Sequence, residues 1–277
     1  MIEAQSTADP VKIVSWNIER GYHPDETCAF LRELEADIYL LTEVDRGNRR
    51  TARVDMFERL RRSLGLAGHF AVEFTELESI WRRIIPKGGP GGGVHGNAVF
   101  SRLPMSEYRC VPLPTNDRLR WDGSTIVPEL FEPRRGHRVA QLFEVQFGEG
   151  RMTVVNTHLE NWRSDAEDRQ TQLAAALRDV RGAEIVLAGD LNPLDGILKT
   201  LWPLRRVNRE VPALRGYLAS CGLVDPFADT DYTSYSLGSR AKLDWICVSP
   251  GLRVEGKWNL RTALSDHNCL VVEVSHV

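Results

Sequence analysis

The feature that most constrains the fold is a set of short apolar runs, each of which borders a polar residue. Apolar runs of about four to six residues that are rich in Val, Ile and Leu are typical of strands covered on both faces. Such runs occupy residues 13–16, 38–42, 152–157, 185–188, 245–248 and 269–272. The chain therefore predicts a core of buried β-strands.

The residues that border these runs are mostly carboxylates, amides and imidazoles. Asn17, Glu43, His158, Asp190 and Asn192 follow runs, and Asp244, Asp266 and His267 precede them. Enzymes of the α/β class usually place their sites at strand ends. If the strands after Asp244 and His267 run antiparallel to the others, all these side chains meet at one rim.

Carboxylates, amides and imidazoles at one rim fit a metal-assisted attack on a phosphate. A hard cation takes oxygen ligands, the attacking water needs a base, and the developing charge needs hydrogen-bond donors. The pattern therefore indicates an enzyme.

Seven short motifs follow one another along the chain, each beside an expected strand. They are W-N (16–17), L-T-E (41–43), G-N-A-V-F-S-R (96–102), N-T-H-L (156–159), G-D-L-N (189–192), L-D-W-I (243–246) and S-D-H (265–267). In this order they resemble the endonuclease/exonuclease/phosphatase superfamily, the DNase I-like group of Mg²⁺-dependent phosphoesterases. The resemblance extends from about residue 11 to the C-terminus.

The resemblance implies a four-layer α-β-β-α sandwich, in which two packed mixed sheets carry helices on their outer faces. Helical spacing predicts these helices at residues 24–34, 52–64, 166–180 and 212–221. Further long strands are expected at residues 94–101, 138–147 and 151–158. A chain of 277 residues is short for two independent cores. We therefore expect one domain over residues 1–277, with residues 1–10 flexible.

The same resemblance implies a metal site with Mg²⁺ or Mn²⁺ as the cofactor. Glu43 is the first choice as a direct ligand because a carboxylate suits a hard cation. Asn17 and Asp266 complete the expected metal set, and Glu19 is an accessory candidate.

The catalytic roles carry over in the same way. Asp190 is expected to orient and deprotonate a metal-activated water, and Asn192 to donate its amide to a phosphate oxygen. Asn97 of the G-N-A motif is expected to shape the phosphate site.

Two histidines complete the expected catalytic set. In the family one histidine acts as an acid near the leaving group, and the other assists the water or stabilises the transition state. We assign these roles to His158 and His267 respectively and leave their order open. Asp244 would hold His267 in its useful tautomer.

The charge pattern gives no global case for non-specific nucleic-acid binding, because the net charge is −3. Arginines nevertheless crowd two segments, at positions 46, 49, 50, 53, 59, 61 and 62 and at positions 134, 135 and 138. They form either a solvated face balanced by nearby acids or a rim that attracts an anionic substrate.

Two irregular segments and the cysteines add smaller expectations. Lys87 to Gly93 reads as a flexible connection in preference to a substrate lid, and the long loop Pro114 to Arg135 is a candidate for substrate specificity. Cys247 and Cys269 lie in apolar runs and read as core thiols. The chain has no signal-like start and no apolar run near about 20 residues, so a cytoplasmic setting without membrane spans is expected.

The expected function is Mg²⁺-dependent hydrolysis of a phosphoester that belongs to a small molecule, a lipid headgroup or a nucleic acid. The alternatives are a DNA endo- or exonuclease or a tyrosyl-DNA phosphodiesterase-like enzyme. A non-catalytic interaction protein is disfavoured because the polar set is intact. We favour a small or membrane-presented ester over long DNA, and the sequence predicts no protein partner.

Overall fold

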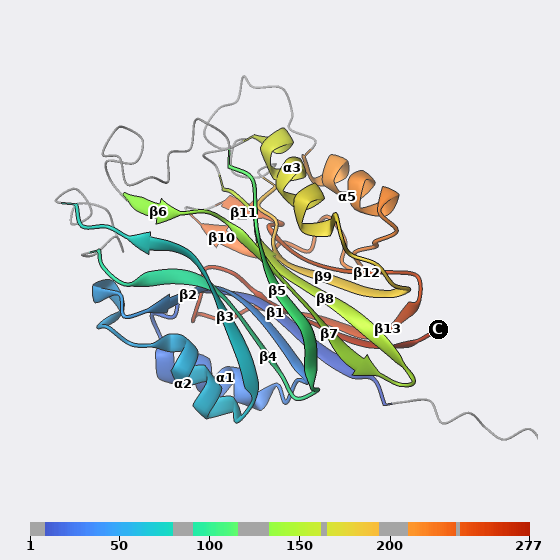
Figure 1. The fold of residues 1–277 in the computed structure, drawn as a ribbon, viewed down its shortest axis with the longest axis horizontal. Coiled ribbons are helices and arrows are strands. Elements are labelled where there is room, and N and C mark those ends of the chain that lie inside the picture. Colours follow the sequence, from blue (N-terminus) through green and yellow to red (C-terminus); the bar gives the residue numbers. More distant parts are fainter. Residues whose placement is uncertain (1–8, 80–90, 116–132, 162–164, 194–209, 237–238) are drawn as a thin grey trace, which may run out of the picture.

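Two β-sheets pack face to face, and each carries helices on its outer face (Figure 1). The computed structural model describes residues 9–79, 91–115, 133–161, 165–193, 210–236 and 239–277. Helices α1 (Pro24–Glu33) and α2 (Met56–Leu64) cover the larger sheet, and α3 (Ala166–Leu177) and α5 (Glu210–Ser220) cover the smaller one. This arrangement confirms the expected four-layer sandwich.

The larger sheet has seven strands in the order β13-β14-β1-β2-β4-β3-β6. They are β1 (Val11–Arg20), β2 (Ile38–Arg46), β3 (Ala67–Glu76), β4 (Val94–Ser101), β6 (Arg134–Gly136), β13 (Leu252–Leu260) and β14 (Cys269–His276). Strands β1 and β2 run parallel, and the remaining neighbours are antiparallel. The sheet is therefore mixed.

The smaller sheet has five strands in the order β12-β9-β8-β7-β5. They are β5 (Met105–Pro112), β7 (Val139–Phe147), β8 (Gly150–His158), β9 (Glu184–Asp190) and β12 (Asp244–Val248). Here β8 and β9 run parallel and the other neighbours are antiparallel. A short hairpin of β10 (Ser234–Ser236) and β11 (Ser239–Ala241) precedes β12.

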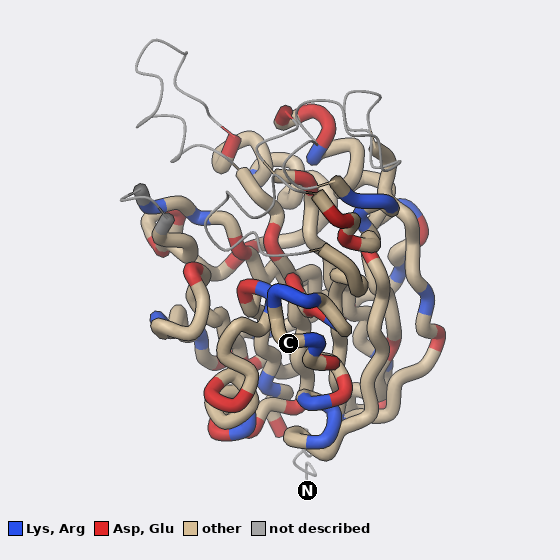
Figure 2. The backbone as a smooth tube through the Cα atoms, turned by 90° about the vertical axis from the view of Figure 1, so that its left-hand side faces the viewer, with Lys and Arg blue, Asp and Glu red and all other residues tan. Residues whose placement is uncertain are grey.

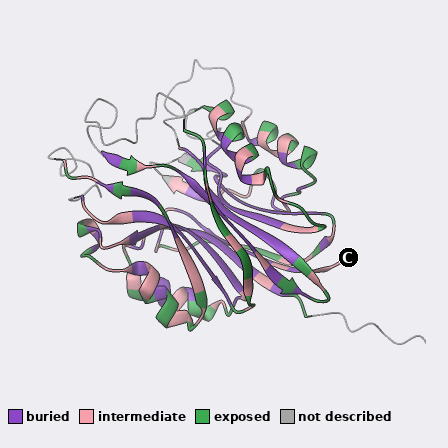
Figure 3. Cartoon of the chain, viewed as in Figure 1, coloured by how far each residue is buried: buried purple, intermediate pink, exposed green. Residues whose placement is uncertain are grey.

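The buried strands have apolar side chains on both of their faces, because each strand lies between two apolar layers. Ile13 points between the two sheets, whereas its neighbour Val14 packs toward the helices of the larger sheet. On the smaller sheet, Ile246 points inward and Trp245 packs beneath the outer helices. Because successive side chains alternate between faces, a strand between two apolar layers reads as a continuous apolar run. Figure 3 shows these buried strands in the interior of the sandwich.

The second helix is shorter than the sequence predicts. Residues 52–55 lie outside it, because Ala52 and Arg53 adopt left-handed φ angles of 53° and 61°. The helix begins at Met56, after Asp55, whose side chain accepts a hydrogen bond from the backbone N–H of Glu58. Asp55 is thus an N-cap, one of the residue types that begin helices.

Strand direction brings the polar ends of the runs to one rim. Strand β14 runs antiparallel to β1, so the start of β14 lies beside the end of β1. Strand β12 runs antiparallel to β9, so the start of β12 lies beside the end of β9. In register, Asp190 is the neighbour of both Asp244 and His158. Gly189 permits this approach, because a Cβ there would lie 1.8 Å from the carbonyl oxygen of Thr157.

Candidate active site

Asp190 lies at the centre of the polar side chains that the rim brings together. Its Oδ2 accepts a hydrogen bond from Nδ2 of Asn17 at 3.1 Å and lies 3.5 Å from Nε2 of His158. Its Oδ1 accepts the backbone N–H of Asn192 at 3.1 Å. Asn17 belongs to the larger sheet and Asp190 to the smaller one, so the site is built across the sandwich.

The surroundings of Asp190 favour its protonated form. Burial raises the pKa of Asp190 to about 7, and the charge of Asp244 adds to this effect, whereas His267 and Asn17 oppose it. A carboxyl group with a pKa near neutrality can accept and release a proton at ordinary pH. Asp190 therefore has the properties of a general base.

His267 forms a hydrogen-bonded pair with Asp244. Its Nδ1 lies 2.7 Å from Oδ2 of Asp244, and its Nε2 lies 3.9 Å from Oδ2 of Asp190. Burial disfavours the charged imidazole, but the carboxylates of Asp244, Asp190 and Asp266 outweigh it and raise the pKa of His267 well above its usual value. At neutral pH His267 is therefore a cation.

His158 is in the opposite state. It is buried at the end of β8, and its Nδ1 makes no hydrogen bond to any residue that the structure describes. Burial and the charge of Arg138 lower the pKa of His158 well below its usual value. The two histidines thus differ in charge at neutral pH, although both lie beside Asp190.

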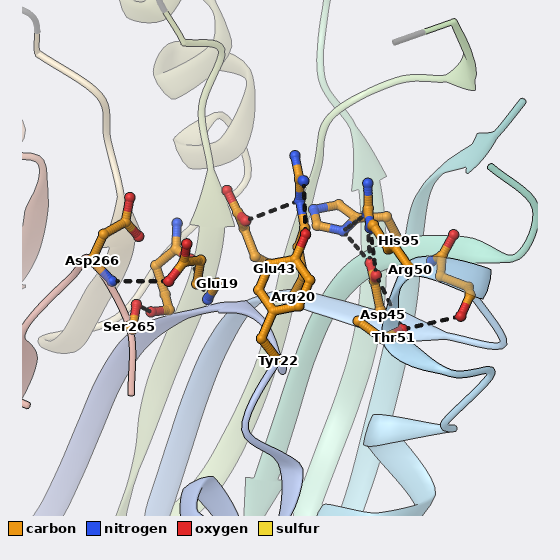
Figure 4. Close-up of polar contacts among 12 residues, drawn as sticks. Glu19, Arg20, Tyr22, Glu43, Asp45, Arg50, Thr51, His95, Ser265 and Asp266 are labelled. Carbon is orange, nitrogen blue, oxygen red and sulfur yellow. Dashed lines mark hydrogen bonds and ion pairs between the residues drawn. The ribbon is translucent and has the colours of Figure 1, made fainter. Parts of the chain in front are cut away.

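The acidic side of the rim contains Glu43, Glu19 and Asp266 (Figure 4). Glu43 lies within an irregularity in the pairing of β2 with β4 and has a φ of 55°. Its side chain is 24% exposed and lies 3.9 Å from Nε of Arg20. Burial disfavours its charge, but His95, Arg20 and His267 outweigh this and lower the pKa of Glu43, which is therefore ionised.

Hydrogen bonds hold the segment that carries Asp266 against the end of β1. The backbone N–H of Asp266 donates to Oε2 of Glu19 at 3.2 Å, and Oγ of Ser265 donates to the carbonyl oxygen of Asn17 at 2.7 Å. Glu19, an accessory metal candidate by sequence, thus has a bond that fixes the backbone beside Asp266.

These residues fit a hard divalent cation. Glu43, Asp266 and Glu19 are partly exposed carboxylates on one edge, the oxygen donors that Mg²⁺ and Mn²⁺ prefer. In the described part of the chain, ligand atoms of Asp190, Asp244 and His267 also lie within 4.8 Å of one another. Nδ1 of His267 already engages Asp244, so this second cluster offers an ion fewer free ligand atoms.

The two asparagines with expected phosphate roles are both buried. Asn192 has a φ of 52°, and its Nδ2 donates to the carbonyl oxygen of Leu159 at 3.0 Å. Asn97 is fully buried in β4, and its Nδ2 donates to Oε1 of Glu73 at 3.2 Å. Asn97 therefore lies in a polar network beneath the rim.

That network contains charged residues that the motifs do not reveal. Arg138 donates to Oε2 of Glu73 at 2.7 Å and lies 3.8 Å from Glu160, and all three side chains are buried. Arg138 interacts electrostatically with both Glu43 and Asp190. A second group joins Asp45, Arg50, Glu76 and His95.

His95 is not among the site residues that the sequence predicts, although it belongs to this charged group. It lies in β4, is buried, and places Nδ1 2.7 Å from Oδ1 of Asp45. Its position next to the G-N-A motif was the available signal, because that motif was already expected to line the site.

Most of the arginines between residues 46 and 62 pair with acids (Figure 2 shows both charges along the chain). The exposed or half-exposed pairs are Arg46–Asp55, Arg49–Glu78, Arg59–Asp25, and Arg61 and Arg62 with Glu58. Arg50 is different, because only 2% of its side chain is exposed and it bonds to Asp45 at 2.8 Å and Glu76 at 2.6 Å. The reading as a balanced, solvated face thus fits the pairs at the surface and fails for Arg50.

Replacing Arg50 by Ala is expected to lower the free energy of unfolding by about 3–5 kcal/mol, because it leaves two buried carboxylates without their cation. Arg49→Ala removes an exposed pair with Glu78 and is expected to cost about 0–1 kcal/mol. Denaturant unfolding of both variants measures the difference. Equal losses would contradict the structural role of Arg50.

Other expectations from the sequence have mixed outcomes. Residues 116–132 of the loop Pro114 to Arg135, and residues 87–90 of the Gly-rich connection, lie outside the described residues. Cys247 and Cys269 are buried thiols, as expected. Among the described helices, none is both long and apolar enough to span a membrane.

The chain belongs to the endonuclease/exonuclease/phosphatase family, whose model it matches over residues 14–267. Members of this family hydrolyse phosphoester bonds. The match includes every site residue named above, from Asn17 to His267. No curated protein matches the sequence.

Solved structures of the family share the fold. The endonuclease/exonuclease/phosphatase from Beutenbergia cavernae has a TM-score of 0.70 at 23% identity, over 97% of this chain and 72% of that one. The human Nocturnin catalytic domain with bound sulfate has a TM-score of 0.65 at 19% identity, over 99% and 96%. D. rerio TDP2 complexed with a single-strand DNA product has a TM-score of 0.60 at 17% identity, over 96% and 98%.

Proposed function

We propose that this protein is a divalent-metal-dependent hydrolase of phosphoester bonds. The observation that carries the proposal is the contact of Asp190 with Asn17 of the opposite sheet and with His158, beside the Asp244–His267 pair. The carboxyl group of Asp190, the imidazole of His267 and the amide of Asn17 thus meet at one rim. Phosphoester hydrolysis requires these groups together.

Glu43 and Asp266 would hold the cation, with Asn17 and Glu19 beside them. Mg²⁺ or Mn²⁺ bound there would offset the negative charge of the phosphate in the transition state. The low pKa of Glu43 supports this assignment, because the carboxylate is ionised before any cation binds.

Asp190 would accept the proton of the attacking water. The hydrogen bonds from Asn17 and from the backbone of Asn192 fix the orientation of its carboxylate. Asn192 uses one amide hydrogen on the carbonyl oxygen of Leu159. The second amide hydrogen is available for a phosphate oxygen.

The charge states favour one order for the two histidines. His267 is a cation at neutral pH and would stabilise the transition state or protonate the leaving group. His158 is neutral and would accept or donate a single hydrogen bond beside Asp190. The resemblance assigned the acid role to His158 with the order left open, and these charge states favour His267 for that role.

A small or membrane-presented ester remains our proposal for the substrate class. The net charge of −3 and the acidic partners of the described arginines between residues 46 and 62 leave little free positive charge for a long polyanion. The single-strand DNA product bound by D. rerio TDP2 keeps nucleic acid as the alternative.

A panel of esters tests the function. Plasmid DNA, single-stranded oligonucleotides, phospholipids, inositol phosphates and an aryl phosphodiester are each incubated with Mg²⁺, Mn²⁺ or excess chelator. We expect at least one ester to be cleaved only when a divalent cation is present. Full cleavage in chelator, or no cleavage of any ester, would contradict the proposal.

A further inference from the structure

We infer that Thr233 is a positioning residue for the Asp244–His267 pair, an inference that rests on the proposed function for its effect on turnover. Thr233 lies just before β10 and is fully buried. Within the described part of the chain, its hydrogen bonds reach neither the acidic edge nor any expected phosphate ligand. Its contacts are with the two backbone segments that carry the pair.

The first segment carries Asp244. Oγ1 of Thr233 accepts the backbone N–H of Leu243 at 3.0 Å and that of Asp244 at 2.9 Å. The backbone N–H of Thr233 also donates to the carbonyl oxygen of Ala241 at 2.9 Å. One side chain thus anchors the backbone from which the Asp244 carboxylate projects.

The second segment carries His267. The carbonyl oxygen of Thr233 accepts the backbone N–H of Asn268 at 2.6 Å, and the N–H of Tyr235 donates to the carbonyl oxygen of Asp266 at 3.0 Å. Between them, Ser234 forms an isolated bridge with His267. The backbone around His267 is therefore bonded on both sides to residues 233–235.

These contacts matter because the pair spans the sandwich. Asp244 begins β12 of the smaller sheet, whereas His267 precedes β14 of the larger sheet. The 2.7 Å bond between Nδ1 and Oδ2 therefore depends on the relative position of two sheets. Thr233 bonds to both carrier segments and can hold that distance.

The hydroxyl group is the essential part of this contact. A threonine oxygen has two lone pairs and can accept both N–H groups, whereas valine has the same shape and no acceptor. Serine keeps the acceptor, and cysteine keeps a weaker one. The series Thr, Ser, Cys and Val therefore grades the bond, with valine matching threonine in shape and serine and cysteine lacking its methyl group.

The experiment compares these variants with a matched control. Thr153→Val removes another buried hydroxyl, which donates to the carbonyl oxygen of Arg181. Thr153 lies near the start of β8, at the end of the strand opposite His158. All assays use a temperature at which circular dichroism shows each variant folded.

Two readouts are measured at one pH. The first is the proton NMR signal of Hδ1 of His267 without substrate, which is identified by its absence in His267→Gln. The second is kcat and KM on the best ester of the panel. For Thr233→Val we expect an upfield shift or loss of the Hδ1 signal, and a decrease in kcat of about 10- to 100-fold with KM nearly unchanged.

Thr233→Ser and Thr153→Val are expected to keep the wild-type Hδ1 signal and a kcat near that of the wild type. If Thr233→Val does not fold, Thr233→Cys decides by the same criteria with a smaller change. A wild-type Hδ1 signal in Thr233→Val would overturn the inference. If Thr233→Val does not fold, a wild-type Hδ1 signal in Thr233→Cys would overturn it. The NMR result stands even if no ester is cleaved, so failure of the inference and failure of the proposed function are distinguishable.

Discussion

Asp190→Asn is expected to lower kcat by about 10²-fold or more, because the variant cannot accept a proton from the attacking water. The asparagine has nearly the same shape and can still accept the backbone N–H of Asn192. The loss should therefore appear in kcat with little change in KM. Steady-state kinetics on the best ester of the panel measure it.

Asp37→Asn is a suitable control, because Asp37 accepts the backbone N–H of Lys12 and lies immediately before β2, at the end opposite Glu43. It is expected to retain turnover near that of the wild type. Turnover near the wild-type value in Asp190→Asn would remove Asp190 from the reaction.

The stability of Asp190→Asn separates a catalytic loss from unfolding. The folded pKa of Asp190 is about 7, above its ordinary 3.8, so its burial destabilises the metal-free protein increasingly as pH rises from about 4 to 7. Asparagine does not titrate. At pH 8 and in chelator the variant is expected to be more stable than the wild type, by no more than about 4 kcal/mol.

Glu43→Gln is expected to weaken the response to Mg²⁺ by on the order of 10²-fold, because it removes the negative charge of the best placed oxygen ligand. The variant should need far more Mg²⁺ for half-maximal turnover. Glu78→Gln serves as the control, because Glu78 is an exposed acid paired with Arg49. An unchanged Mg²⁺ requirement in Glu43→Gln would contradict the assignment of Glu43 to the cation.

The rim was predictable because strand periodicity is a local property, and only the antiparallel direction of β12 and β14 had to be assumed. A buried strand must read as an apolar run, and the polar residue after it must lie at a sheet edge. Asn17, Asp190 and His267 could therefore be placed together before any contact was known. The hydrogen bond from Asn17 to Asp190 and the position of His267 3.9 Å from Asp190 agree with that placement.

The charged network beneath the rim was not predictable, because its partners are distant in sequence and have no fixed spacing. Arg50 reads as part of an arginine-rich surface, yet it lies between Asp45 and Glu76 in the interior. Thr233 reads as an ordinary polar residue, because its two acceptor bonds go to the backbone of another segment. Such roles follow from tertiary packing and leave no periodic signal.

Three of the longer strands, β3, β5 and β13, were also missed for a physical reason. Strands β3, β5 and β13 are partly exposed, so their apolar residues alternate with polar ones and form no continuous run. Strand β5 is an edge of the smaller sheet and β13 an edge of the larger one. Edge strands commonly carry charged side chains, which weakens the pattern.

The position of Mn²⁺ in crystals of the protein soaked with Mn²⁺ and inorganic phosphate is the most direct test of a metal-dependent hydrolytic site at this rim. Anomalous diffraction is expected to place the ion against the carboxylate oxygens of Glu43 and Asp266, with phosphate between the ion and Asn192. An ion held instead by Asp190, Asp244 and His267, or no ion beside Glu43 at saturating Mn²⁺, would contradict it.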